Sequence, residues 1–362
     1  MRAIFLGIKD SKNVSKEDML SRKCIYQFKV GNEIKEFSID DENKNYSIRN
    51  KLMIGYEYDI ELEEDRVLSV TLTSSIDVEG IVDGYNPGER TIKNFLMTSL
   101  GPLGKTLYVY GGGWNVQDEG SSKLTTTIGV SPTWEKFYSS VDENYSYTGT
   151  TYPTNEWNEY YYAGLDCSAY VGWTLYNTMN SITSEYGGFV NSSTKMAKLL
   201  SEGYNYGEFK HPNTSDYKTI SKSLHPGDIV SIDGHVYIVI GTCSDNSVVI
   251  IHSTVSPSIT GISGGGVQMS AININGDNDT NCEAYRLAKR YMEEYYGDWA
   301  QRYPVVVKPV SVYFSFPDDK ESTGIFSWYS NDNGLNDLDG IRYMNASDVL
   351  ETIFSEKLEK RR

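Results

Sequence analysis

Cys167 lies where the sequence predicts the start of a helix. It stands within residues 164–170, GLDCSAY, and apolar side chains recur at helical spacing from there to position 179. Asp166 is a favourable N-cap, so Cys167 is expected in the first helical turn. In that turn, unpaired N–H groups and the positive end of the helix dipole favour a thiolate and can donate to a developing oxyanion. On position alone, a small buried cysteine remains the alternative.

Two of the four histidines follow Cys167 on one predicted β-hairpin. If residue 240 pairs with 247, His235 lies directly opposite His252, with Cβ atoms roughly 4.5–5.5 Å apart. His252 is then expected to hold one nitrogen of His235 while the other nitrogen faces the thiol, as a base and its orienting residue do in a triad. A slip of one residue would put the two rings on opposite faces. His211 and His225 lie in proline-containing loop sequence and are expected at the surface.

The elements that must position these side chains indicate an α+β protein. Residues 1–80 alternate apolar and polar side chains in five short runs, as in a small SH3-like or OB-like β-barrel. Residues 92–100 have helical spacing and follow a Pro-Gly pair. Residues 114–163 are polar with scattered aromatic side chains, and their length favours a functional insertion or a subdomain.

The remaining chain, residues 281–362, is expected to form an α/β extension packed on the preceding domain. Its pattern predicts a helix over 283–295, strands within 305–316, and a helix over 347–357 that Ser347 caps. The expected domains are therefore a barrel at 1–80, a catalytic domain at 88–280 with its insertion, and this extension.

Composition excludes several classes of function. The chain has 362 residues and a net charge of −16, and it lacks the clustered Lys and Arg that nucleic-acid binding needs. No apolar stretch approaches the ~20 residues of a membrane span, and the N-terminal apolar run is too short for a secretory signal. The protein is thus expected in the cytoplasm if the chain is complete, and in the secreted or cell-wall fraction otherwise. The oligomeric state is not predicted.

The cysteines do not predict a metal or disulfide framework. None has CxxC spacing, and the three besides Cys167 are expected to be small buried residues: Cys24, Cys243 and Cys282. The run 264–266, GGG, lacks the Lys-Ser/Thr ending of a phosphate-binding loop and is expected to be a plain flexible turn.

Four motifs, taken in order, resemble the NlpC/P60 family of papain-like cysteine peptidases. They are LYVYGG at 107–112, LDCSAYV at 165–171, LHPGDIV at 224–230 and GHVYIVIG at 234–241, and His252 then resembles the third polar position. The resemblance covers roughly residues 88–275. It implies a papain-like domain in which a helix bearing Cys167 packs on an antiparallel sheet, and it implies no cofactor or metal.

The resemblance also implies an activity and a set of residue roles. The activity is hydrolysis of peptidoglycan stem peptides, commonly between D-γ-glutamyl and the diamino acid, so the partner is a wall-derived peptide. Cys167 is then the nucleophile, His235 the base and His252 the orienting residue. The resemblance also implies that Tyr108, Asp166 and Ser168 bind the substrate. It implies the same role more weakly for Ser193, because the segment FVNSS at 189–193 lacks the family's Pro-Arg.

Two other functions fit the same residues. An amidase or acyltransferase would use this triad on a different acyl bond. A non-catalytic wall-binding module would use the barrel and the aromatic insertion, with the triad unused. The intact set of one cysteine and two histidines favours an enzyme.

Overall fold

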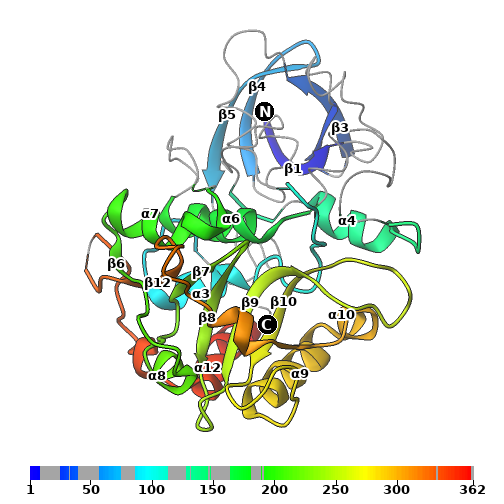
Figure 1. Cartoon of the computed structure of the whole chain (residues 1–362). Helices are drawn as coiled ribbons and strands as arrows, with labels where there is room; N and C mark the ends of the chain where they lie inside the picture. Colours follow the sequence, from blue (N-terminus) through cyan, green and yellow to red (C-terminus); the bar gives the residue numbers. More distant parts are fainter. Residues whose placement is uncertain are drawn as a thin grey trace.

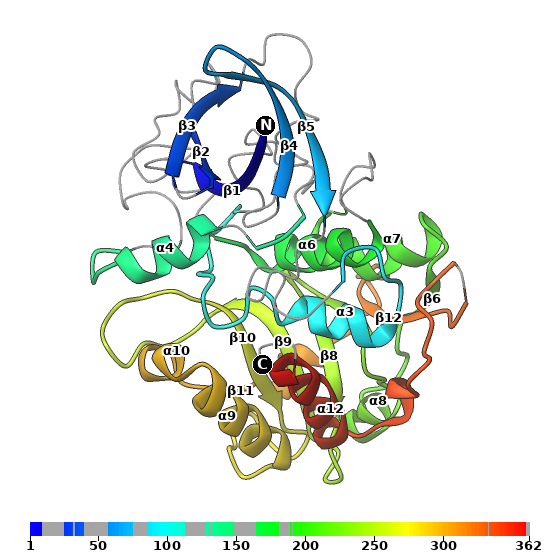
Figure 2. The same ribbon diagram turned by 180° about the vertical axis from the view of Figure 1, so that it is seen from behind.

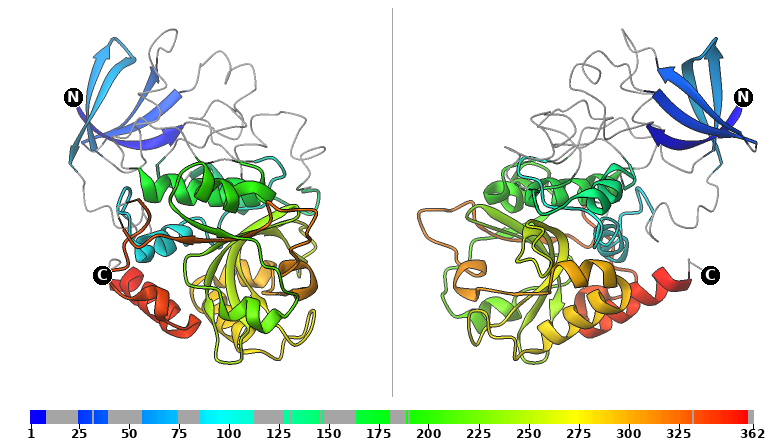
Figure 3. Two further views of the ribbon diagram at one scale, coloured as in Figure 1. Left: turned by 60° about the vertical axis from the view of Figure 1, so that its left-hand side comes forward. Right: turned by 90° about the vertical axis from the view of Figure 1, so that its right-hand side faces the viewer.

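The computed structural model is an α+β protein with a closed barrel and a separate mixed sheet covered by helices (Figure 1). It describes residues 1–8, 25–31, 33–39, 57–74, 86–112, 128–130, 132–145, 147, 164–180, 189, 191–331 and 333–359. The barrel lies on the side of helices α4 (Pro132–Ser140) and α6 (Cys167–Met179), away from α8 (Tyr217–Lys222) (Figures 2 and 3).

The predicted five-stranded barrel is confirmed. Its strands are β1 (Arg2–Ile8), β2 (Ile25–Val30), β3 (Glu33–Ile39), β4 (Glu57–Glu63) and β5 (Arg66–Ser74). They close in the order β1-β2-β3-β5-β4, antiparallel except for the short β3–β5 pairing. Period-two alternation points Phe5, Phe28 and Tyr58 into the interior, where each is no more than 1% exposed.

In the described part of the chain, the second sheet has seven strands in the order β11-β10-β9-β8-β7-β12-β6. Its strands are β6 (Gly207–Lys210), β7 (Ile229–Ile232), β8 (His235–Thr242), β9 (Val248–Val255), β10 (Gly265–Ile272), β11 (Val307–Lys308) and β12 (Gly324–Trp328). All neighbours are antiparallel except β10 and β11, so the sheet is mixed where an antiparallel sheet was expected.

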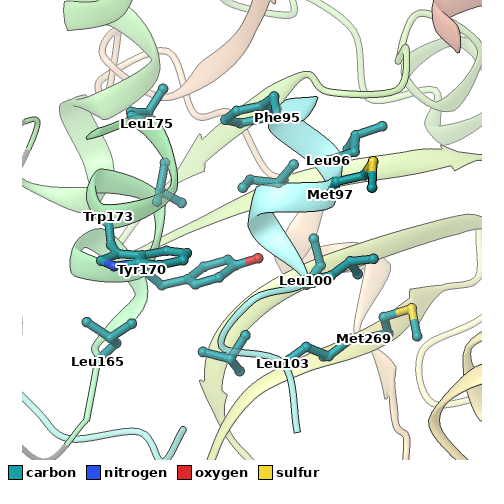
Figure 4. Close-up of a cluster of buried hydrophobic side chains, with 14 of the residues drawn as sticks. Phe95, Leu96, Met97, Leu100, Leu103, Leu165, Tyr170, Trp173, Leu175 and Met269 are labelled. Carbon is teal, nitrogen blue, oxygen red and sulfur yellow. The ribbon is translucent and has the colours of Figure 1, made fainter. Parts of the chain in front are cut away.

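Helices cover both faces of this sheet. One face packs against α3 (Ile92–Ser99), α6, α9 (Glu283–Tyr295) and α12 (Ala346–Glu359), and the other against α8 and α11 (Val310–Tyr313). Figure 4 shows α6 and α3 joined by large side chains, among them Tyr170 and Phe95. The buried hydroxyl of Tyr170 donates to the carbonyl of Ser99 at 2.9 Å, which fixes the helix that begins at Cys167.

The segment 281–362 is built into the sheet as well as packed on it. Its strand β11 extends one edge, and β12 lies between β7 and β6. The strands expected within 305–316 are mostly wrong, because β11 has two residues and a helical turn follows. Pro309 cannot donate to a strand ladder, and its carbonyl instead accepts the N–H of Tyr313 at 2.9 Å. The last helix is present, but Asn345 caps it through the Asp348 N–H at 3.0 Å, in place of Ser347.

Most of the insertion at 114–163 lies outside the described residues. Its described part consists of 128–130, 132–145 and 147, and it contains α4. Cys24 also lies outside. Cys243 and Cys282 are 6% and 1% exposed, which confirms that they are small buried residues.

Candidate functional site

Cys167 is the first residue of α6, as the capping pattern predicts. The Asp166 carboxylate accepts the N–H of Ala169 and the hydroxyl of Ser168, each at 2.8 Å. Just before the helix, the carbonyl of Leu165 accepts the hydroxyl of Ser253 on β9 at 2.6 Å. This bond fastens the start of the helix to the strand that carries His252.

The two histidines meet. Nε2 of His235 lies 2.8 Å from Nδ1 of His252, and Nε2 of His252 lies 3.0 Å from the hydroxyl of Ser270 on β10. For His235 to offer Nδ1 as a base, its Nε2 must carry the proton and donate to His252. His252 must then donate from its own Nε2 to Ser270. Both contacts fit this arrangement, in which each donor along the chain meets an acceptor.

The shared face was predicted correctly, but the register was not. Thr242 pairs with Val248 and Ile238 with Ile251, with a β-bulge between Val239 and Gly241. At the turn, the pairing of β8 with β9 is shifted by three residues from the predicted register. The bulge reduces this shift by one, so near His235 the net shift is two residues. An even shift keeps both rings on one face. The rings are therefore diagonal neighbours, and the length of two imidazoles spans the gap.

The thiol lies beside β8, the strand that begins at His235. The backbone N–H of Val236, the residue after His235, points at the Cys167 sulfur, as does that of Ser168. These donors lower the pKa of the thiol, but burial and the nearby Asp166 charge outweigh them and raise the pKa to about 12. The expected thiolate is therefore wrong for the resting site, which holds a neutral thiol.

Both imidazoles are also neutral at rest. Burial lowers the pKa of His235 to about 3, and the ammonium of Lys308 adds to the effect. His252 is fully buried, and burial, Lys308 and His235 together hold its pKa well below the usual range. Neutral His252 keeps a free lone pair at Nδ1, which it needs to accept from His235. With a neutral thiol and a neutral imidazole, a reaction at the Cys167 sulfur would move its proton as the new bond forms, not beforehand.

Tyr108 lies near the thiol, and glycines make room for its segment. Burial raises the pKa of Tyr108, and the charge of a Cys167 thiolate would raise it further. The Tyr108 N–H donates to Gly265 at 2.8 Å. A Cβ on Gly266 would lie 2.0 Å from the carbonyl of Thr106. The expectation of a plain flexible turn at 264–266 is therefore wrong, because Gly265 and Gly266 open β10 against this segment.

The three remaining predicted substrate residues also lie close to the site: Asp166, Ser168 and Ser193. Asp166 and Ser168 flank Cys167 and are bonded to each other. Ser193 begins the short 3-10 helix η2 (Ser193–Lys195), whose Thr194 hydroxyl accepts the Gly234 N–H at 3.1 Å. Gly234 immediately precedes His235, so η2 lies beside the turn that leads into β8.

The sequence did not point to three polar residues at the site. Ser270 lies on β10, which no pattern had predicted as a strand. The other two are Lys308 and Thr254, and the Lys308 ammonium donates to the Thr254 hydroxyl at 3.1 Å. Burial lowers the pKa of Lys308 to about 8. Alternation around Ser270 was the available signal, since Gln268, Ser270 and residue 272 share the face that carries His252.

The other two histidines are half-buried, not fully on the surface as expected. His211 Nδ1 lies 2.7 Å from the carbonyl of Thr323, which makes Nδ1 the protonated nitrogen. Nδ1 of His225 lies 3.7 Å from Oδ2 of the buried Asp228 carboxyl. Neither contacts the pair at His235.

A further group brings ligand atoms of Cys243, Asp245 and Glu283 within 4.8 Å of one another. Its carboxylates already have partners. Asp245 accepts the Glu283 N–H at 2.7 Å, and Glu283 accepts the N–H and hydroxyl of Ser244. The group fastens the hairpin turn to the start of α9, which explains its carboxylates without a metal ion.

Comparison with known proteins adds no relative: no protein-family model, no curated protein and no solved structure matches this chain. Among the described residues, no helix combines the length and the apolar character needed to cross a bilayer.

Proposed function

We propose that this protein is a cysteine peptidase that hydrolyses peptidoglycan stem peptides through Cys167, His235 and His252. The observation that carries the proposal is the 2.8 Å contact between the two imidazoles, beside a thiol at a helix N-terminus. The bond cleaved is the D-γ-glutamyl–diamino acid bond, and this choice rests on the resemblance in sequence. On the same ground we assign the catalytic domain to the papain-like architecture and the barrel to an SH3-like or OB-like companion domain.

The mechanism begins from a neutral pair. His235 Nδ1 takes the proton of Cys167 as the sulfur attacks the peptide carbonyl. The imidazolium keeps its Nε2 proton and donates it to Nδ1 of His252, and His252 keeps its own Nε2 proton and donates it to the Ser270 hydroxyl. The Cys167 N–H at the start of α6 donates to the oxyanion, the amine leaves with the proton from His235, and water then releases the acyl group.

The substrate contacts in this proposal follow from the residues around the thiol. Tyr108 lines the approach to Cys167. The carboxylate of Asp166, partly exposed and raised in pKa by burial, faces the start of the helix. A substrate amine would give this carboxylate a positively charged partner, and the Ser168 hydroxyl would offer the amine a further polar contact.

The test uses defined stem peptides and mass spectrometry of the products. The purified chain is expected to release L-Ala-γ-D-Glu from a tripeptide or tetrapeptide, and Cys167→Ala is expected to remove all cleavage while the protein stays folded. Cys243→Ala is the matched control, because that buried cysteine lies outside the site. A Cys167→Ala variant with full activity would end the proposal.

The same experiment separates the rival functions. Cleavage or transfer restricted to other amides would identify an amidase or acyltransferase. Tight retention of wall peptides without turnover, together with an unreactive Cys167, would identify a binding module.

A further inference from the structure

The C-terminal segment places an aromatic ring against both histidines. Tyr313 ends α11 and is 7% exposed. Its ring centroid lies 5.5 Å from that of His235 and 5.9 Å from that of His252, with interplanar angles of 62° and 72°. Edge-to-face contacts of this kind are favourable and directional. One ring therefore restrains both imidazoles from the same face of the sheet.

Tyr313 is itself held at both ends. Its carbonyl accepts the hydroxyl of Tyr237 at 2.8 Å, and the two rings lie 5.4 Å apart. Its hydroxyl bonds with the side chain of Thr254. Thr254 in turn accepts from the ammonium of Lys308 at 3.1 Å, and Lys308 also lies 3.4 Å from the carbonyl of Val255. These contacts run from β11 through β9 to the aromatic ring.

The histidine pair needs such a restraint. His235 is the first residue of β8, and the residue is partly exposed where the strand begins. Because His235 and His252 are diagonal neighbours, a modest rotation of either side chain breaks their bond. The hydrogen bond to Ser270 fixes only the far side of His252.

We propose that Tyr313, held by Thr254 and Lys308, is the positioning residue that keeps the His235–His252 hydrogen bond in one geometry and away from water. The catalytic value of this positioning role rests on the proposed peptidase function, but the contacts that Tyr313 makes do not. Tyr313 and Lys308 lie outside residues 88–275, which carry the resemblance, so this chain's own C-terminal segment completes the site. Lys308 adds a second effect, because its ammonium favours the neutral, accepting form of His252.

The test reads the imidazoles directly by ¹⁵N NMR of the full chain. Four histidines give a simple spectrum, and His211, protonated at Nδ1, is an internal reference for the opposite tautomer. The variants are Tyr313→Leu, which removes the ring, and Tyr313→Phe, which keeps the ring and removes the hydroxyl. Tyr291→Leu is the matched control, since Tyr291 is 5% exposed and packs on Phe354 away from the site.

In the wild type, His235 and His252 are expected to be protonated at Nε2, with a slowly exchanging proton between them. Tyr313→Leu is expected to speed that exchange by about tenfold and to mix the tautomers, because a hydrogen bond exposed to water loses most of its net value. Tyr313→Phe should show a smaller change in the same direction, and Tyr291→Leu none.

Wild-type exchange and tautomers in a folded Tyr313→Leu protein would overturn the proposal. If Tyr313→Leu does not fold, Thr254→Val takes its place beside Tyr313→Phe, and wild-type behaviour in both would overturn it equally. A protein with this NMR signature that cleaves no stem peptide would keep the positioning role and reject the proposed substrate instead.

Discussion

Ser270→Ala tests whether the imidazole chain must end on a hydrogen-bond acceptor. Ser270 is fully buried, and its hydroxyl lies 3.0 Å from Nε2 of His252. When His235 becomes an imidazolium, it occupies Nδ1 of His252, so the proton of His252 has to stay on Nε2. Alanine leaves that N–H buried without a partner in the charged state, whereas the neutral pair avoids the penalty by moving the His252 proton to Nδ1 and donating it to His235.

The expected size follows from the cost of an unpaired buried donor, about 1–3 kcal/mol. Each 1.36 kcal/mol is tenfold in rate, so kcat/KM should fall about five- to 150-fold on the stem peptide. KM should change little, because Ser270 lies behind His252 and away from the thiol. The assay is steady-state cleavage followed by mass spectrometry, with ¹⁵N NMR of the imidazoles as a second measurement.

Ser221→Ala is the matched control, because Ser221 is also fully buried and its hydroxyl donates to the carbonyl of Asn246 at 2.7 Å, far from the histidines. It should lose comparable stability and keep its activity. Equal activity in Ser270→Ala and Ser221→Ala would refute the assigned tautomers.

Three further predictions concern the thiol, the imidazoles and the glycines. Alkylation of Cys167 should keep accelerating up to about pH 12 without a plateau near neutrality, because burial raises the pKa of its thiol; a plateau near pH 7 would contradict the neutral resting site. Burial lowers the pKa of His252, so stability present above pH 6.5 should be lost on acidification, at up to about 1.4 kcal/mol per pH unit. Urea unfolding should therefore show a weaker loss for His252→Gln between pH 6.5 and 4, and equal slopes would count against it. Gly266→Ala should destabilise by several kcal/mol in the same assay, since its Cβ meets the Thr106 carbonyl; Gly261→Ala, with positive φ but open space, should cost only about 1–2 kcal/mol.

Local patterns predicted the elements that carry the site. The Asp166 cap placed Cys167 correctly in the first turn of α6, and alternation put both histidines on one face. These features depend on near neighbours in the chain, which is why the sequence reveals them. The barrel strands were recognisable for the same reason.

Distances set by long-range pairing were not predictable. The register of β8 and β9 depends on a bulge and a turn that no residue pattern announces. Lys308 and Tyr313 reach the histidines only because β11 joins the sheet beside β10, a pairing between segments far apart in the chain. The thiol pKa also depends on burial, which the helix position alone does not give.

The most direct measurement is the mass of the intact protein during turnover of L-Ala-γ-D-Glu-diamino acid peptides. If Cys167 is a nucleophile assisted by His235, rapid quenching should reveal an adduct with the mass of the L-Ala-γ-D-Glu acyl group, mapped to the peptide that contains Cys167. The adduct and the products should both be absent from Cys167→Ala. Products without any adduct, at equal rates in the wild type and Cys167→Ala, would contradict the account.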